Sequence, residues 1–388
     1  MTSIWDRANP QLRDLAVYEP GKPIEETARE LEVDPGAIIK LASNENPLGP
    51  SPKAIQAMRA ALENAQLYPD GDGFYLRSAL AARLGFAREN IILGNGSNEV
   101  IEFLGHAFLN PGDDVIVSEH AFIAYKLIAT LFGARTIETP SPHYEHDLEA
   151  MLNAITPKTR IVMLNTPLNP IGRVFDVNEL AMVAHVLERS DAVAICDEVY
   201  EHLVFDGRAH LPLIGFPGME ERVVRVGSAG KMFSLTGWKV GWVTGAVALI
   251  DVIAKAHQFI TFTTPPALQR GTAYALSNEM DFTLGLTRTL QDNRDLLADR
   301  LARMGFDVLP CEGTYFLTAG IGALTNERDG DFCRRLVREA GVALIPLSAF
   351  FETGEPSHLV RFAFCKKRAL LEEAMDRLER FFAGQVRV

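Results

Sequence analysis

The middle of the chain alternates short runs of apolar, often β-branched residues with longer amphipathic stretches. The runs that we expect to form strands are 90–93, 114–117, 134–138, 160–164, 192–196 and 223–226. One intervening stretch, 177–190, has the apolar spacing of an amphipathic helix. Because strands joined through helices run parallel, this alternation predicts an α/β fold, a mainly parallel sheet with helices on both faces. In such a sheet, ligands bind beyond the carboxyl ends of the strands.

The C-terminal part of the chain has a different pattern. We expect a long helix at 287–304, short strands at 306–309, 316–319 and 359–363, and a final amphipathic helix at 368–382. This order predicts a smaller α+β domain. The length of 388 residues suits two domains. We expect an N-terminal arm with part of the small domain at 1–45, a large domain at 46–290 and a small C-terminal domain at 291–388.

Composition and charge exclude several classes of protein. The net charge of −12 argues against binding to nucleic acid, which needs clustered lysine and arginine. The chain has no apolar run long enough to span a membrane, and its first residues, MTSIWDRANPQLRDLAVY, lack the apolar region of a signal peptide. We therefore expect a cytoplasmic protein that binds neither nucleic acid nor membrane.

The cysteines and histidines do not predict a metal site. The four cysteines lie far apart and form no CxxC pair: Cys196, Cys311, Cys333 and Cys365. Reduced thiols are the expected state. The nine histidines have no spacing typical of metal ligands, so we predict that no metal is bound.

A lysine follows the last predicted strand in a segment rich in small residues, VGSAGKMF. Lys231 lies three residues after Ser228, and Lys239 follows eight residues later. A lysine at a strand end can attack a carbonyl if burial lowers the pKa of its amine. The serine hydroxyl and the second lysine could hold a phosphate. A solvated lysine in a flexible loop is the alternative interpretation.

Polar residues also follow two earlier strands. Asp197 and Tyr200 come directly after one strand, and Asn169 lies in the loop NTPLNPIG after another. A carboxylate at a strand end can pair with a protonated pyridine nitrogen, and the hydroxyl and the amide can bind a phenolic oxygen. The alternatives are an aspartate that caps a helix and an ordinary proline-rich turn.

Two further motifs are consistent with an anionic ligand. The segment GNGSNE at 94–99 lies between a strand and a helix, where free N–H groups can bind an anion. It lacks the third glycine of a dinucleotide-binding loop. Arg361 interrupts an apolar strand and could bind a carboxylate through two parallel hydrogen bonds, although a surface arginine on an edge strand explains the pattern equally well.

In this order and spacing, the motifs resemble those of the fold-type I aminotransferases, which depend on pyridoxal 5′-phosphate (PLP). The resemblance covers nearly the whole chain. It implies that Lys231 forms a Schiff base with PLP and transfers protons, and that Asp197 pairs with the pyridine nitrogen. It also implies that Asn169 and Tyr200 contact the phenolic oxygen and that Phe122 stacks on the ring. The residues implied around the phosphate are Gly96, Ser97, Asn98, Ser228 and Lys239.

The resemblance extends to the substrates and to a second subunit. Arg361 matches an arginine that binds the substrate α-carboxylate, and Tyr18 and Asn44 are further candidates for substrate contact. Tyr68 matches a tyrosine that reaches the phosphate in the neighbouring subunit, which implies a homodimer with shared active sites.

The two halves of the chain resemble different subfamilies. The segments 18–22 (YEPGK), 43–49 (SNENPLG) and 94–99 are similar to histidinol-phosphate aminotransferases. From about residue 165 onward, the chain is similar to kynurenine, glutamine and methionine aminotransferases, notably in 197–205 (DEVYEHLVF), 227–242 and 313–316 (GTYF). The sequence alone does not decide how this mosaic arose.

Two positions bear on the substrate. Histidinol-phosphate enzymes hold the substrate phosphate at two places where this chain has Leu168 and the segment GVALIP at 341–346, which contains no arginine. Ile171 replaces a usual threonine in the same loop as Leu168. Because burying a phosphate against hydrocarbon is costly, we expect a free amino acid with an apolar or aromatic side chain as donor and a 2-oxo acid as acceptor.

Three other functions remain open from the sequence. The nearest is transamination of histidinol phosphate. The second is another PLP reaction on the same scaffold, such as decarboxylation or elimination. The third, of a different class, is a PLP-binding regulatory domain without turnover.

Overall fold

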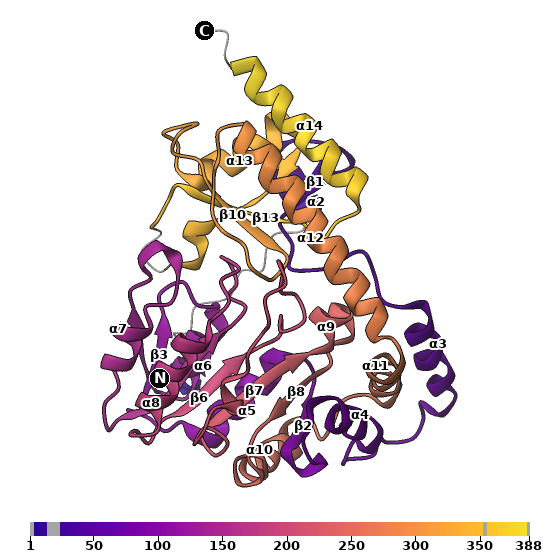
Figure 1. The fold of residues 1–388 in the computed structure, drawn as a ribbon, viewed down its shortest axis with the longest axis vertical. Coiled ribbons are helices and arrows are strands. Elements are labelled where there is room, and N and C mark those ends of the chain that lie inside the picture. The colour runs from indigo at the N-terminus through magenta and orange to yellow at the C-terminus, as the bar shows by residue number, and fades with distance from the viewer. Residues whose placement is uncertain (1–3, 14–23, 352–354, 386–388) are drawn as a thin grey trace.

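The computed structural model describes residues 4–13, 24–351 and 355–385. Two sheets of different size dominate it, as Figure 1 shows, with the larger sheet below and the smaller one above. Tyr18, a candidate substrate residue, lies outside the described residues.

The larger sheet has seven strands and carries all six that the sequence predicts. In spatial order they are β2 (Ile91–Gly94), β8 (Gly241–Thr244), β7 (Val223–Ser228), β6 (Val193–Asp197), β5 (Thr159–Asn165), β3 (Asp114–Ser118) and β4 (Arg135–Thr139). β8 runs antiparallel to both of its neighbours, and the other pairs are parallel. Sequence analysis missed β8 because its four residues show no clear alternation of apolar and polar side chains.

Helices cover both faces of this sheet, because the strands are apolar on both sides. On β3, Val115 and Val117 pack into one core cluster, while Ile116 between them packs into another. The helices around the sheet are α3 (Pro52–Ala61), α4 (Phe74–Leu84), α5 (Ser97–Phe108), α6 (Ile123–Leu131), α7 (Leu148–Asn153), α8 (Val177–Leu187), α10 (Val247–Ile260) and α11 (Pro266–Asn278). The predicted mainly parallel α/β sheet is thus confirmed.

The smaller sheet is antiparallel. Its strands are, in order, β12 (Ile345–Pro346), β13 (Leu359–Ala363), β10 (Phe316–Gly320) and β9 (Asp307–Val308). Beside it, β1 (Ile39–Lys40) pairs in parallel with β11 (Val342–Ala343), which brings the N-terminal part of the chain to the C-terminal part. The remaining helices are α1 (Pro10–Arg13), α2 (Ile24–Leu31), α9 (Ala229–Met232), α12 (Met280–Arg303), α13 (Asp329–Ala340) and α14 (Arg368–Gln385).

The long helix α12 connects the two sheets (Figure 1). Its buried leucines belong to one continuous core that also contains Val224 of β7 and Phe316 of β10. The domain boundary that we place near residue 290 falls inside this helix and stays a proposal. None of the helices in the described residues is long and apolar enough to cross a membrane.

All four cysteines are buried and free, in line with the expected reduced thiols. Burial raises the pKa of each thiol above its ordinary value. Cys196 lies in β6 of the larger sheet, whereas Cys311, Cys333 and Cys365 lie in the C-terminal part.

A buried ion pair stabilises the segment that follows β6. Arg225 in β7 donates to Glu198 over 2.7 Å and to Glu201 over 2.9 Å, and His210 lies 2.9 Å from the same Glu198 carboxylate. Burial alone would raise the pKa of Glu198, but Arg225 and His210 together keep it below its ordinary value. Since Glu198 is only 1% exposed, its charge depends on these partners.

Arg225→Ala should lower the free energy of unfolding by about 3 to 5 kcal/mol, because Glu198 would stay buried without its cation. Urea unfolding followed by circular dichroism measures the change. The matched control is Arg303→Ala, whose ion pair with Asp299 is exposed, and it should cost less than about 1 kcal/mol. Equal losses in the two variants would contradict this role for Arg225.

Candidate active site

The strand register brings the predicted polar residues to one edge of the larger sheet. Asn165 ends β5 and lies opposite Asp197, which ends β6. Asp197 in turn lies opposite Val226 of β7, two residues before Ser228. The short helix α9 begins directly after β7 and carries Lys231. The carboxyl ends of β5, β6 and β7 therefore hold the site, as expected for an α/β sheet.

Lys231 is held by acceptors that lie outside the larger sheet. Its Nζ donates to Oδ1 of Asn44 over 2.8 Å, to the backbone carbonyl of Asn44 over 3.2 Å and to the hydroxyl of Tyr315 over 3.1 Å. Desolvation lowers the pKa of the amine to about 8. A neutral fraction of the amine thus exists near neutral pH, which nucleophilic attack and proton transfer both require.

Asp197 is buried and held in one orientation. The Tyr125 hydroxyl donates to its Oδ2 over 2.6 Å, and the backbone N–H of Val199 donates to Oδ1 over 3.3 Å. Burial raises the pKa of Asp197, while Tyr125, Val199 and the positive charge of Lys231 act against that rise. A cationic ring nitrogen placed against this carboxylate would favour its ionised form further.

Asn169 and Arg361 meet at the wall of the site. Arg361 in β13 donates to Oδ1 of Asn169 over 2.9 Å and to the backbone carbonyl of Ala42 over 3.3 Å. Its guanidinium carbon lies 3.9 Å from the centre of the Phe316 ring. Arg361 is only 5% exposed, so it is a buried residue of the smaller sheet and not a surface arginine.

The three segments expected around a phosphate lie side by side because of β8. Gly241 of β8 pairs with Gly94 on one side and with Ser228 on the other. Gly96 has a φ of +88° and directly precedes the N-terminus of α5, where Ser97 and Asn98 present backbone N–H groups. A Cβ atom on Gly96 would lie 3.7 Å from Cα of Lys239, which shows how closely the two loops approach.

A cavity of about 380 Å³ lies beside Asn169 and Arg361. The residues singled out from the sequence that line it are Phe122, Asn169, Arg361 and Asn44. Lys40, Ile345 and Phe350 form other parts of its wall. A site that combines a lysine amine, a buried carboxylate and an anion-binding helix N-terminus with such a cavity can bind a phosphorylated aldehyde and a small amino acid.

The structure also places three other residues that the sequence singled out, Asn44, Leu168 and Tyr68. The Oδ1 atom of Asn44, expected to contact substrate, faces Lys231, and the Tyr200 hydroxyl donates to it over 3.0 Å. Leu168 is buried in a hydrophobic cluster with Ile171 and does not line the cavity. Tyr68 is 94% exposed, away from the site of its own chain.

Two contributing tyrosines escaped sequence analysis. Tyr125 lies in the first turn of α6, three residues after Phe122, which caps that helix, and the two ring centres are 5.8 Å apart. Tyr315 belongs to the GTYF segment, which was noted only for its similarity to other enzymes. No sequence signal shows that their hydroxyls meet Asp197 and Lys231, because both contacts join distant parts of the chain.

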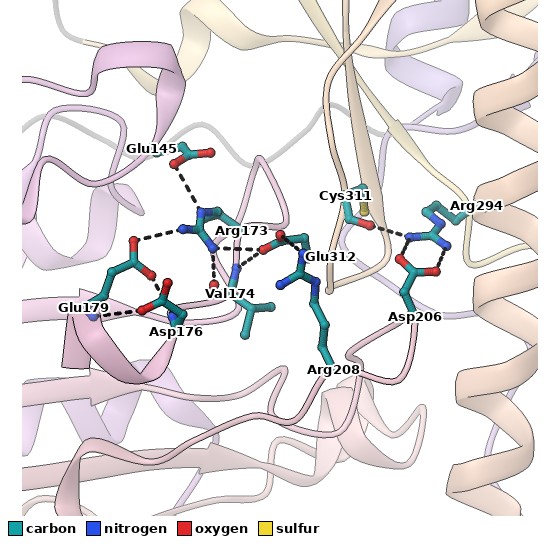
Figure 2. A network of polar contacts seen from close by, with 10 residues as sticks. All are labelled: Glu145, Arg173, Val174, Asp176, Glu179, Asp206, Arg208, Arg294, Cys311 and Glu312. Carbon is teal, nitrogen blue, oxygen red and sulfur yellow. Dashed lines mark hydrogen bonds and ion pairs between the residues drawn. The ribbon is translucent and has the colours of Figure 1, made fainter. Parts of the chain in front are cut away.

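A network of ion pairs fastens the loop that carries Asn169 to the smaller sheet (Figure 2). Arg173 reaches three carboxylates at N···O distances between 2.9 and 3.2 Å: Glu145, Glu179 and Glu312. Glu312 also accepts the backbone N–H of Val174 over 2.9 Å and pairs with Arg208 over 2.7 Å.

The same network reaches α12. Arg294 forms two hydrogen bonds of 2.7 Å to the carboxylate of Asp206 and donates to the backbone carbonyl of Cys311 over 2.7 Å (Figure 2). Such two-point contacts between arginine and carboxylate restrict orientation as well as distance. The segment from Cys311 to Tyr315 is thereby tied to the loop of Asn169 and to α12.

Comparison with known proteins places this site in a family. The model for aminotransferase class I and II matches residues 37–378. The chain belongs to the class I and II aminotransferases.

Similar members of the family act on different substrates. A probable N-succinyldiaminopimelate aminotransferase of Mycobacterium tuberculosis is 38% identical over 349 residues, which are 84% of this chain and 88% of that protein. A histidinol-phosphate aminotransferase of Nitrosospira multiformis is 36% identical over 322 residues, 81% and 79% of the two chains. A crystal structure of YbdL from Escherichia coli, described as having a methionine aminotransferase function, superposes with a TM-score of 0.88 at 29% identity over 96% of this chain and 99% of that one.

The family makes this protein a PLP-dependent aminotransferase with the fold of type I, as the sequence predicted. Decarboxylation, elimination and a purely regulatory role are therefore set aside.

The residues present fit the cofactor, because Gly241 packs so tightly that a Cβ atom there would lie 2.7 Å from the Gly96 carbonyl carbon. Only a cradle without side chains lets the backbone of 96–98 approach a phosphate in this way. When bound, PLP takes up the electron pair left on the substrate α-carbon.

Borohydride treatment of the purified aminotransferase should fix the cofactor to Lys231, because this amine lies at the strand edge with a lowered pKa. The visible absorbance of the enzyme should disappear, and mass spectrometry of peptides should find the adduct on Lys231. An adduct on Lys239 or any other lysine would show that the assignment is wrong.

Asp197→Asn should keep the cofactor but lose transamination by about 100-fold or more, because a neutral amide cannot stabilise a protonated ring nitrogen. Cofactor content follows from absorbance, and turnover from an assay with 2-oxoglutarate. Asp299→Asn, at an exposed carboxylate of α12, is the control and should leave turnover unchanged. Near-normal turnover of Asp197→Asn would mean that another group tunes the ring.

Proposed function

We propose that this aminotransferase transfers the amino group of a free α-amino acid to a 2-oxo acid and that Arg361 binds the α-carboxylate. The observation that carries the proposal is that Arg361 and Asn44 line one cavity and that Asn44 holds the amine of Lys231. A substrate whose carboxylate contacts Arg361 can therefore bring its α-carbon towards Lys231. Two parallel N–H···O bonds would orient the carboxylate as well as bind it.

In this proposal Lys231 moves the proton of the reaction. Its neutral amine removes a proton from the substrate α-carbon, which is feasible because burial lowers its pKa to about 8. Asp197 keeps the ring nitrogen protonated. The Oδ1 atom of Asn169 accepts from Arg361, so its Nδ2 is the atom left to donate to the phenolic oxygen of the cofactor.

The cavity wall supports a donor with an apolar or aromatic side chain. Phe122, Ile345 and Phe350 line it, and the nearby segment 341–346 supplies no arginine for a phosphate. Histidinol phosphate also lacks the α-carboxylate for which Arg361 is suited. Because Leu168 does not face the cavity, the argument against histidinol phosphate depends on Ile345 and on Arg361.

One feature favours a second candidate, the transfer of an amino group to or from N-succinyldiaminopimelate. Lys40 lines the same cavity, and its side-chain amine forms no hydrogen bond or ion pair with any described residue. A cation without a partner in a substrate cavity can bind a carboxylate at the far end of a longer substrate. The relative from Mycobacterium tuberculosis that is 38% identical carries the corresponding name.

We also propose that two chains form a dimer with shared active sites. Exposed apolar and aromatic side chains gather in the region between α3 and α4, around a hollow of about 870 Å³. They include Leu67, Tyr68, Phe74 and Tyr75. A second copy that covers this face would bury them and could bring Tyr68 to the phosphate cradle of its partner.

A comparison of donors with 2-oxoglutarate as acceptor tests the substrate. We expect kcat/KM for phenylalanine, methionine, tryptophan or kynurenine to exceed that for histidinol phosphate. Arg361→Ala should lower kcat/KM for free amino acids by about 10- to 100-fold, because a charge-assisted contact is lost. The matched control is Arg335→Ala, because Arg335 of α13 pairs with Glu327 and does not line the cavity.

Lys40→Ala separates the two candidates. If the donor is apolar, this variant should keep its kcat/KM within about threefold, whereas loss of a carboxylate contact should lower turnover of N-succinyldiaminopimelate by about 10-fold or more. A clear preference of the unaltered enzyme for histidinol phosphate would contradict both candidates.

A further inference from the structure

Three donors converge on one oxygen atom beside the reactive lysine. Oδ1 of Asn44 accepts three hydrogen bonds. The donors are the Tyr315 hydroxyl at 2.6 Å, Nζ of Lys231 at 2.8 Å and the Tyr200 hydroxyl at 3.0 Å. An amide oxygen has two lone pairs and cannot serve three donors equally well. The contact with Tyr200 is the longest, and Tyr200 is also the residue assigned to the phenolic oxygen of the cofactor. The two shorter contacts, from Tyr315 and Lys231, are the ones that remain when Tyr200 turns to the cofactor.

Tyr315 contacts the lysine as well as the asparagine. Its hydroxyl accepts a hydrogen bond from Nζ of Lys231 over 3.1 Å while it donates to Asn44. The hydroxyl, the amide oxygen and the amine therefore form a closed triangle. Each group in it restricts where the other two can lie, as in other fully satisfied buried networks.

The ring of Tyr315 cannot move easily. Its side chain is fully buried, and its ring centre lies 5.4 Å from that of Tyr200 and 4.8 Å from that of Phe316. The backbone carbonyl of Tyr315 accepts from Phe364 over 3.0 Å. The preceding segment is tied down through Glu312 and Cys311 (Figure 2).

Lys231, by contrast, has a flexible chain of four methylene groups. To move a proton at the substrate α-carbon, the free amine of Lys231 must stay close to that atom. Among the described residues, Nζ donates to the rigid hydroxyl of Tyr315 and to the two oxygens of Asn44.

We propose that Tyr315 is a positioning residue: with Asn44, it holds the amine of Lys231 in place whenever that amine is not bonded to the cofactor. The inference rests on the role proposed for Lys231. It assigns to Tyr315 no contact with substrate or cofactor. Its consequence is that loss of one hydroxyl should impair proton transfer and leave substrate binding intact.

Tyr315→Phe tests the proposal, because it removes the hydroxyl and keeps the ring. With a free amino acid as donor, kcat should fall by about 10- to 100-fold, while KM stays within about threefold. The second readout uses the full chain without cofactor, and follows by absorbance the rate at which added PLP attaches, as a function of pH. Since the hydroxyl accepts from the charged amine and favours it, its loss should move the midpoint of this profile to lower pH by about half a unit or more.

The matched control is Tyr144→Phe, which removes a hydroxyl that contacts His358 far from Lys231. It should change neither kcat nor the midpoint. The same values in Tyr315→Phe and Tyr144→Phe, with borohydride still fixing the cofactor to Lys231, would overturn this inference alone. Borohydride labelling of another lysine would overturn the role of Lys231 and this inference with it.

Asn44→Ala keeps the proposal testable if Tyr315→Phe does not fold. It should also lower kcat, because the amine then loses the oxygen that Tyr315 orients. The double variant should lose little more than the worse single variant, since both changes break one triangle. Additive losses in the double variant would show that the two residues act separately and would overturn the positioning role.

Discussion

The register between neighbouring strands of the larger sheet is the constraint on which the site depends. Asn165 lies opposite Asp197, Ser228 opposite Gly241, and Gly241 opposite Gly94. A shift of one residue in any of these pairs would turn the side chains of that strand to the other face. The geometry of the cofactor site therefore depends on backbone hydrogen bonds within the sheet as well as on the loops that contact the cofactor.

The smaller sheet supplies the other half of the site and needs a fixed position of its own. Arg361 and Tyr315 come from this part of the chain, while Lys231 and Asp197 belong to the larger sheet. Two features of the fold fix the position of the smaller sheet relative to the larger one. The continuous core along α12 fixes the general placement, and the ion pairs around Glu312 and Arg294 fix the loops that touch the cavity (Figure 2).

Sequence reasoning predicted the elements whose signal is local. The parallel strands, the final helix and the motif around Lys231 were all visible, because apolar periodicity and small-residue loops follow from neighbouring residues. It missed β8, whose four residues pair with β2 on one side and β7 on the other. It also overlooked Tyr125 and Tyr315, whose hydroxyls contact Asp197 and Lys231. Those outcomes depend on contacts between distant segments, which no local pattern contains.

Alkylation of the four buried thiols can report partial unfolding of the protein. Thiolate is the reactive form, and burial of all four cysteines suppresses it. Alkylation should thus be limited by opening of the structure and not by the chemistry of the reagent. Because Cys196 lies in the larger sheet and Cys333 in α13, their separate labelling rates would show whether the two parts of the chain open together or one before the other.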